Sequence, residues 1–181
     1  SHGSLETNDA VVAVVAIMRD DGYQEGEHVE IQRECCRLMA DLTAGNACTE
    51  AVLASDAASM LVRAMMSLGQ DAAVQWQGCR ALTNLSCGGD ECRKAVRDAG
   101  GANALMLAME MHPEDLPLAQ QSGRALRGLA SGGIEGVRAL LEARATRWVL
   151  PHTAEELAAV GIGSLLEAVE LLLRFHPDDV D

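Results

Sequence analysis

An internal repeat of 43 to 44 residues constrains the fold of this 181-residue chain more than any other sequence feature. Three windows align, at residues 32–45, 75–88 and 119–132. They share an arginine column, a leucine column and a glycine column, which comprise Arg37, Arg80 and Arg124, then Leu42, Leu85 and Leu129, then Gly45, Gly88 and Gly132. A repeat of this length is typical of helical arrays, in which each unit buries its apolar face against its neighbours.

The composition favours the same fold class. Hydrophobic residues make up 49% of the chain, but its only aromatic residues are Tyr23, Trp76, Trp148 and Phe175. Sheet proteins are usually richer in aromatic and β-branched side chains, whereas the Ala, Leu and Met that supply much of the apolar mass here are good helix formers. We therefore predict an all-α fold.

Each repeat unit is expected to contain one short helix followed by two longer helices. In the unit with the clearest signals, the three helices are predicted over residues 90–98, 102–111 and 114–130. Asp90 is expected to cap the first helix, and Gly100 and Gly101 are expected to end it. Pro117 is tolerated because it falls in the first turn of the third helix.

The third helix of a unit is predicted to have one buried and one exposed face. Gly78, Leu82 and Leu85 follow the spacing i, i+4, i+7 and therefore form the buried face. Arg80 lies about 200° from Gly78 around the helix, so it points away from the core. The residues one turn from Arg80, on the same exposed face, are Trp76, Gln77 and Asn84. The equivalent buried positions of the three windows are Met39, Leu82 and Leu126.

The run from Arg80 to Leu85, the glycine break at 99–101 and the three-helix unit resemble the armadillo repeat family, most clearly over residues 32–149. The resemblance implies a right-handed α-solenoid, an armadillo-like superhelix of about three to four three-helix repeats. Residues 1–8 are then expected to be a tag scar or disordered N-terminus, and residues 9–181 a single domain. Its units are a partial repeat (9–45), two full repeats (46–88 and 89–132) and a last repeat with C-terminal capping helices (133–181).

Armadillo domains are non-enzymatic modules that bind other proteins along a concave groove lined by the third helices, and the resemblance implies this role here. In importin-α-like members, a Trp and an Asn on this helix hold an extended peptide. In this chain the arginine column occupies the Trp position, and Asp41, Asn84 and Gly128 occupy the Asn position. Only Asn84 matches, so binding of basic nuclear-localisation peptides is not expected.

The arginine column indicates a different ligand. Arginines at equivalent positions of stacked units would form a stripe, and guanidinium donors suit carboxylates and peptide carbonyls. The predicted partner is an extended, acidic or carboxylate-bearing segment of another protein. The predicted partner-binding residues are Arg37, Trp76, Gln77, Arg80, Asn84, Gln120, Gln121 and Arg124.

The sequence leaves alternatives open. Each arginine of the column could be neutralised within its own helix, as Glu34 and Asp41 permit for Arg37, whereas no acid lies three or four residues from the other two arginines. Trp76 could anchor a partner or pack against the next repeat. At the level of function, the alternative is a structural or self-association module that forms a homodimer or packs against other domains of a longer protein.

The charge and the cysteines argue against several other classes. The chain has 14 basic and 27 acidic residues, a net charge of −13, which disfavours nucleic-acid binding and an anchor on anionic membranes. The six cysteines have neither zinc-module nor disulfide-framework spacing, so reduced thiols and a cytoplasmic location are expected. No motif predicts a catalytic site, a cofactor or a metal site, and we expect a monomer.

Overall fold

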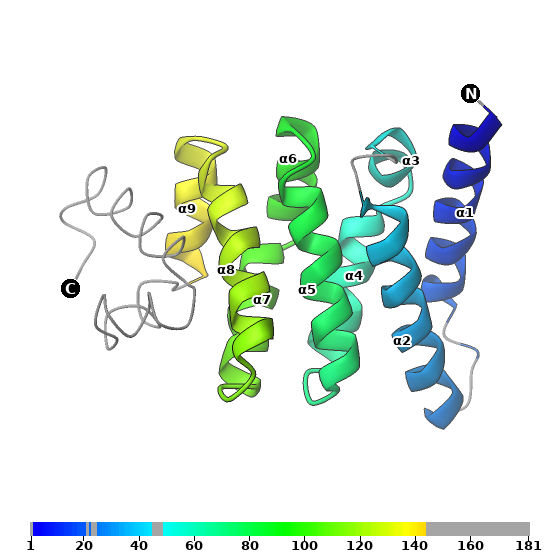
Figure 1. Cartoon of the computed structure of the whole chain (residues 1–181), viewed down its shortest axis with the longest axis horizontal. Coiled ribbons are helices and arrows are strands. Elements are labelled where there is room, and N and C mark those ends of the chain that lie inside the picture. The colour runs from blue at the N-terminus through cyan, green and yellow to red at the C-terminus, as the bar shows by residue number, and fades with distance from the viewer. Residues whose placement is uncertain (1, 21, 23–24, 45–48, 144–181) are drawn as a thin grey trace.

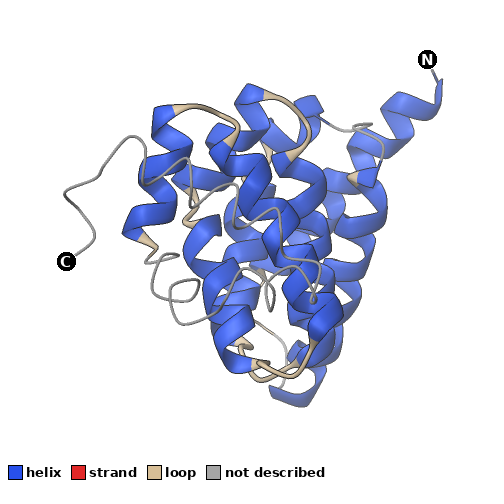
Figure 2. Cartoon of the chain, turned by 60° about the vertical axis from the view of Figure 1, so that its left-hand side comes forward, coloured by secondary structure: helices blue, strands red, loops and turns tan. Residues whose placement is uncertain are grey.

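The helices follow the repeat. A computed structural model describes residues 2–20, 22, 25–44 and 49–143, and the regular secondary structure in these ranges is α-helical, without a strand (Figures 1 and 2). The helices are α1 (His2–Arg19), α2 (Glu25–Leu42), α3 (Thr49–Ala54), α4 (Ala57–Ser67), α5 (Ala72–Ser86), α6 (Asp90–Asp98), α7 (Gly101–Met111), α8 (Leu116–Ala130) and α9 (Ile134–Glu142). The predicted C-terminal capping helices, Trp148 and Cys48 lie outside the described residues.

Helices at equivalent positions of the repeat lie side by side in three rows. The third helices α2, α5 and α8 form the front row of Figure 1, and α5 packs against both of its neighbours. In the second row α4 contacts α1 and α7, and in the remaining row α6 contacts α3 and α9. One hydrophobic cluster extends from α1 to α9. Each unit is therefore stabilised by the units beside it.

Glycine sets the boundary between α6 and α7, the first and second helices of one unit, where the sequence predicts it. α6 occupies the predicted range, and Gly100 then adopts a φ of 80°, a left-handed conformation that favours glycine. The predicted cap is wrong, because Gly89 holds the N-cap position of α6. Asp90 lies in the first turn and forms an ion pair with Arg93 at 2.6 Å.

The N-terminal helix departs from the prediction. α1 begins at His2, so residues 2–8, which were expected to be disordered, belong to a helix. Val11, Val15 and Met18 are buried and hold the second half of α1 against the core. Because no proline interrupts the preceding residues, the helix continues toward the N-terminus from this anchored half.

The predicted core column is confirmed. Met39, Leu82 and Leu126 are each 0% exposed and lie in the three successive third helices. Gly78 is buried beside them because α4 passes close by. A Cβ atom at this position would come within 2.5 Å of Met65 Cγ. The small residue therefore sets how closely α4 and α5 approach.

Leu82→Ala should lower the free energy of unfolding by about 2–5 kcal/mol, because it removes a large, fully buried side chain and leaves a cavity. Urea denaturation followed by circular dichroism measures this loss. Met66→Ala is the control, since Met66 is 43% exposed and surface truncations usually change stability by about 0.5 kcal/mol or less. Equal effects of the two substitutions would mean that the helix register is wrong.

Two aspartates cap the third helices at the same repeat position. Asp71 Oδ1 accepts a 3.0 Å hydrogen bond from Val74 N–H in α5, and Asp115 Oδ1 accepts one of 3.0 Å from Leu118 N–H in α8. The second cap starts α8 two residues later than predicted. Asp71 Oδ2 also accepts hydrogen bonds from Arg33 of α2. The Nε and one terminal nitrogen of Arg33 lie 2.8 and 2.7 Å from this oxygen. The hydrogen bonds from Arg33, and next those of the cap, hold the pKa of Asp71 below its ordinary value.

Asp71→Ala should destabilise the protein more than Asp115→Ala does, because only Asp71 also holds Arg33 of the neighbouring helix. Loss of the cap alone typically costs about 0.5–2 kcal/mol. A lowered pKa means that the carboxylate stabilises the folded state above the unfolded-state pKa of about 3.9, and that this contribution is lost as pH falls through the folded-state pKa. Urea denaturation at neutral pH and at about pH 3 should therefore give a smaller difference between wild type and Asp71→Ala at the lower pH.

Candidate partner-binding surface

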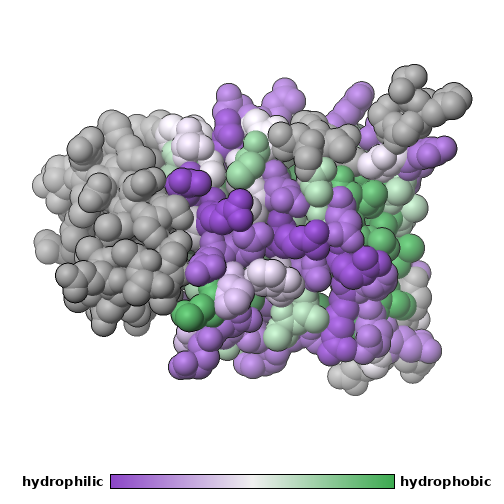
Figure 3. Space-filling view, in the orientation of Figure 1, coloured by the Kyte–Doolittle hydropathy of each residue, from purple (hydrophilic) through white to green (hydrophobic). Residues whose placement is uncertain are grey.

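The predicted partner-binding residues lie on three helices that pack against one another. The helices α2, α5 and α8 form the front row of Figure 1, and we call their exposed and half-buried side chains on this front side the third-helix face. Its members are Arg37, Asp41, Trp76, Gln77, Arg80, Asn84, Gln120, Gln121 and Arg124. Hydrophilic side chains form a band across the molecule in this view (Figure 3). The three arginines of the column are thus carried by successive, contacting helices.

Arg37 is neutralised within its own helix. Its Nε donates to Glu34 at 2.9 Å, a terminal nitrogen also contacts Glu34, and the other terminal nitrogen lies 3.0 Å from Asp41 Oδ2. The hydrogen bond from Arg37 lowers the pKa of Glu34, and the same bond raises the pKa of Arg37. Of the two readings that the sequence left open, the structure therefore supports neutralisation for Arg37.

Arg80 is also paired, but with a carboxylate of the preceding unit. One terminal nitrogen lies 2.7 Å from Asp41 Oδ1 in α2, and the other donates to Gln77 Oε1 at 3.2 Å. A search of residues three or four positions away could not find this pair, because Asp41 and Arg80 are far apart in sequence. The usable signal was the repeat itself, which stacks the two helices and brings Asp41 beside the next arginine of the column.

Arg124 differs from the other two arginines. It is exposed, and its only hydrogen bond to a described residue is a 3.4 Å contact with Gln121 Oε1. Within the described ranges, no carboxylate lies within ion-pair distance of its guanidinium group. The positive charge of the column is therefore balanced at α2 and α5, and open at α8.

Asn84 uses its amide donors to join two units. Nδ2 donates to the Ala40 carbonyl at 2.9 Å and to Thr43 Oγ1 at 3.3 Å, both in the preceding unit. Thr83 makes a comparable link in the other direction, since its hydroxyl lies 3.0 Å from the Gln121 carbonyl of α8. Asn84 therefore ties α5 to α2, a role that its position in the repeat did not indicate.

Trp76 packs against the array, which is one of the two roles that the sequence left open, and its anchoring of a partner stays a prediction. Its side chain is half-buried and packs against the hydrophobic core, so part of the indole is in contact with the array and part faces solvent. Gln77 and Gln121 are also half-buried, and Gln120 is exposed. Besides Asn84, α5 and α8 thus offer one aromatic edge and three glutamine carboxamides on this face.

Most of the described cysteines are buried thiols. Cys35, Cys36, Cys79 and Cys92 are buried and free, and Cys87 is exposed. Burial raises the pKa of Cys36 and of Cys79 to about 12 and that of Cys35 to about 11, so these groups stay protonated. Within the described ranges, no group of three or more His, Cys, Asp or Glu side chains is placed to hold a metal ion.

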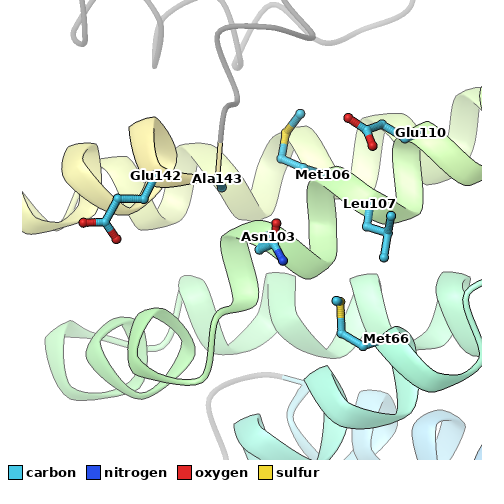
Figure 4. Close-up of a pocket in the computed structure, with 7 residues that line it drawn as sticks. All are labelled: Met66, Asn103, Met106, Leu107, Glu110, Glu142 and Ala143. Atoms are coloured by element: carbon cyan, nitrogen blue, oxygen red, sulfur yellow. The ribbon is translucent and has the colours of Figure 1, made fainter. Parts of the chain in front are cut away.

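A cavity of about 340 Å³ lies between α4, α7 and α9 (Figure 4). Its polar lining, as far as the structure describes it, is Asn103, Glu110 and Glu142, and its apolar lining includes Met66 and Met106. Figure 4 shows the two carboxylates on opposite sides of Asn103 and not converging on a common point. Among the described lining residues, no two carboxylates are therefore placed to act as an acid–base pair.

In the described part of the chain, no helix is both long and apolar enough to cross a membrane. The comparison with protein-family models gave no match, and the comparison with curated proteins gave none either.

Three similar solved structures are described only as engineered proteins. Two are 25% identical in sequence, with TM-scores of 0.67 and 0.68, and the match covers 91% of this chain and 67% and 68% of theirs. The third is 26% identical with a TM-score of 0.65, and the match covers 91% of this chain and 40% of that structure. The likeness supports an all-helical fold and brings no function with it.

Proposed function

We propose that this chain is an armadillo-type α-solenoid, a right-handed superhelix that acts as a non-enzymatic protein-binding module. Its third-helix face would form a concave groove that holds an extended segment of a partner protein. One observation carries the proposal. Side chains 43 to 44 residues apart in sequence lie on three successive, contacting helices and together form a polar face, on which Arg124 has no carboxylate partner among the described residues. Repetition of one residue type along an array suits a ligand that is itself extended.

The chemistry of the face suits a peptide main chain with acidic side chains. Carboxamides both donate and accept hydrogen bonds, so Gln77, Gln120 and Gln121 can pair with peptide N–H and C=O groups. Arg124 offers guanidinium donors to a carboxylate, and the exposed edge of Trp76 offers an aromatic anchor. The net charge of −13 repels an acidic partner elsewhere, so local cations would guide it to this face.

The thiols fit a reducing, cytoplasmic location. Cys35, Cys36 and Cys79 are packed in the core as small apolar side chains, where oxidation would require the array to open. An intracellular binding module is the role that combines these buried thiols with a polar, repeated face.

Replacing Arg80 and Arg124 together by Glu should weaken the binding of groove ligands about ten-fold and leave the helical content unchanged. Two lost charge pairs of about 0.2–1 kcal/mol each, with added repulsion, give a change of this size. Fifteen-residue peptides selected on the wild-type protein by phage display are suitable ligands, and fluorescence anisotropy measures their affinity.

The matched control reverses the charge at two other positions, with Lys94→Glu and Arg138→Glu. Both side chains are exposed and pair with acids within their own helices, away from the third-helix face. This control changes the net charge equally and should leave affinity within about two-fold. If every selected peptide bound the Arg80→Glu/Arg124→Glu protein at wild-type strength, the third-helix face would not be the binding surface.

A second candidate function, self-association, rests on the outer side of α1. Val12 is 53% exposed and Ile17 is 41% exposed, with Ala13 and Ala16 exposed between them. Apolar side chains are visible over α1 at the right-hand end of Figure 3. A second copy of the chain could cover this apolar stripe of α1.

The patch is small, and we expect the wild-type protein to remain a monomer in size-exclusion chromatography with light scattering from about 10 to 200 µM, because stable interfaces bury on the order of 1,200 Å² or more. A mass that doubles over this range, and that returns to the monomer value in Ile17→Lys, would support self-association instead. Lys substitution at exposed Met66 is the control for the added charge.

A further inference from the structure

We propose that the third-helix face contains a carboxylate-binding site between Arg80 and Arg124, which takes an Asp or Glu side chain of the partner segment. The inference rests on the proposed function and adds to it the chemistry of one ligand position. It follows from a carboxylate that the chain itself already holds at the equivalent place one unit earlier.

Asp41 is the internal example of such a ligand. Its Oδ2 lies 3.0 Å from a terminal nitrogen of Arg37, and its Oδ1 lies 2.7 Å from a terminal nitrogen of Arg80. The two arginines occupy the same position in successive units, so their guanidinium groups bracket one carboxylate across the boundary between α2 and α5. The spacing of the third helices is therefore suited to a carboxylate held by two members of the arginine column.

The next pair in the column has the same framework without the carboxylate. α5 packs against α8 as it does against α2. Arg80 and Arg124 each contact the Gln three residues earlier in the helix, at 3.2 and 3.4 Å. Asn84 stands where the repeat would place the next Asp41, and its amide is turned back toward Ala40.

A partner carboxylate is the group that completes this arrangement. Between Arg80 and Arg124 it would accept from one free donor of each guanidinium group, as Asp41 does from Arg37 and Arg80. The α2–α5 position cannot take the same ligand, because Asp41 fills it. The face thus has one occupied and one open carboxylate position, and the open position lies on the α5–α8 side.

The test is an NMR titration of the full chain with acetyl-(Glu)4-amide at low salt, observing the arginine Nε–Hε signals. We expect shifts at Arg80 and Arg124, little change at Arg37, and no response to acetyl-(Gln)4-amide. Arg124→Gln should weaken tetraglutamate binding about three-fold, the size of one exposed charge pair. Arg138→Gln, which makes the same change off this face, should not.

Asp41→Ala tests the template directly. Removing the side chain that fills the position between Arg37 and Arg80 should make Arg37 responsive to tetraglutamate and raise the affinity about two- to three-fold, because a second position opens. Asp98→Ala is the control for the lost negative charge, since Asp98 pairs with Lys94 within α6.

Several outcomes would overturn the inference. These are no detectable binding of tetraglutamate, equal effects of Arg124→Gln and Arg138→Gln, and inorganic phosphate giving the larger shifts at Arg80 and Arg124. Suppose that tetraglutamate gives one of these outcomes, while phage-selected peptides bind wild type and lose affinity for the Arg80→Glu/Arg124→Glu protein. The carboxylate site is then ruled out and the proposed function stands. If those peptides bind the Arg80→Glu/Arg124→Glu protein with wild-type affinity, the proposed function fails, whatever the result with tetraglutamate.

Discussion

The packing of α5 between α2 and α8 is the constraint on which the rest of the structure depends. Leu82 fills the core from α5, and Met39 and Leu126 do so from the flanking helices. Small residues allow the close approach, since a Cβ atom at Gly128 would lie 3.1 Å from the Ser86 carbonyl oxygen. Because these contacts hold the three helices together, equivalent side chains of the repeat lie on successive, contacting helices.

Polar bonds between helices of the same unit make the packing within each unit directional. Buried Gln32 donates to the Met18 carbonyl at the end of α1, and buried Gln75 donates to the Met65 and Leu68 carbonyls at the end of α4. A buried polar group without a partner is costly, so these bonds disfavour sliding of one helix along another. The third-helix face consequently divides its residues. Some of its side chains, such as that of Asn84, tie units together, and others, such as those of Gln120 and Arg124, are exposed.

The sequence predicted what depends on local chemistry and on the repeat. The range of α6, the break at Gly100 and the buried column through Leu82 are correct, because glycine geometry and helical periodicity act over a few residues. The pair between Asp41 and Arg80 and the bonds of Asn84 were missed, because they cross from one unit to the next. The helical residues before Asp9 were missed too, since an apparent tag sequence does not reveal that the helix behind it is anchored.

The uneven charge along the arginine column has a consequence for how an extended ligand could lie. A uniform stripe of cations would accept an acidic segment in several registers of similar energy, because each exposed charge pair contributes only about 0.2–1 kcal/mol. Asp41 removes that degeneracy by occupying the position between Arg37 and Arg80. A partner carboxylate that slid one unit toward α2 would meet Asp41 and be repelled, so one internal acid can disfavour the wrong register as well as balance two arginines. Affinity would then have to come from contacts that do not depend on charge, for which the half-exposed Trp76, one helical turn before Arg80, offers an aromatic surface.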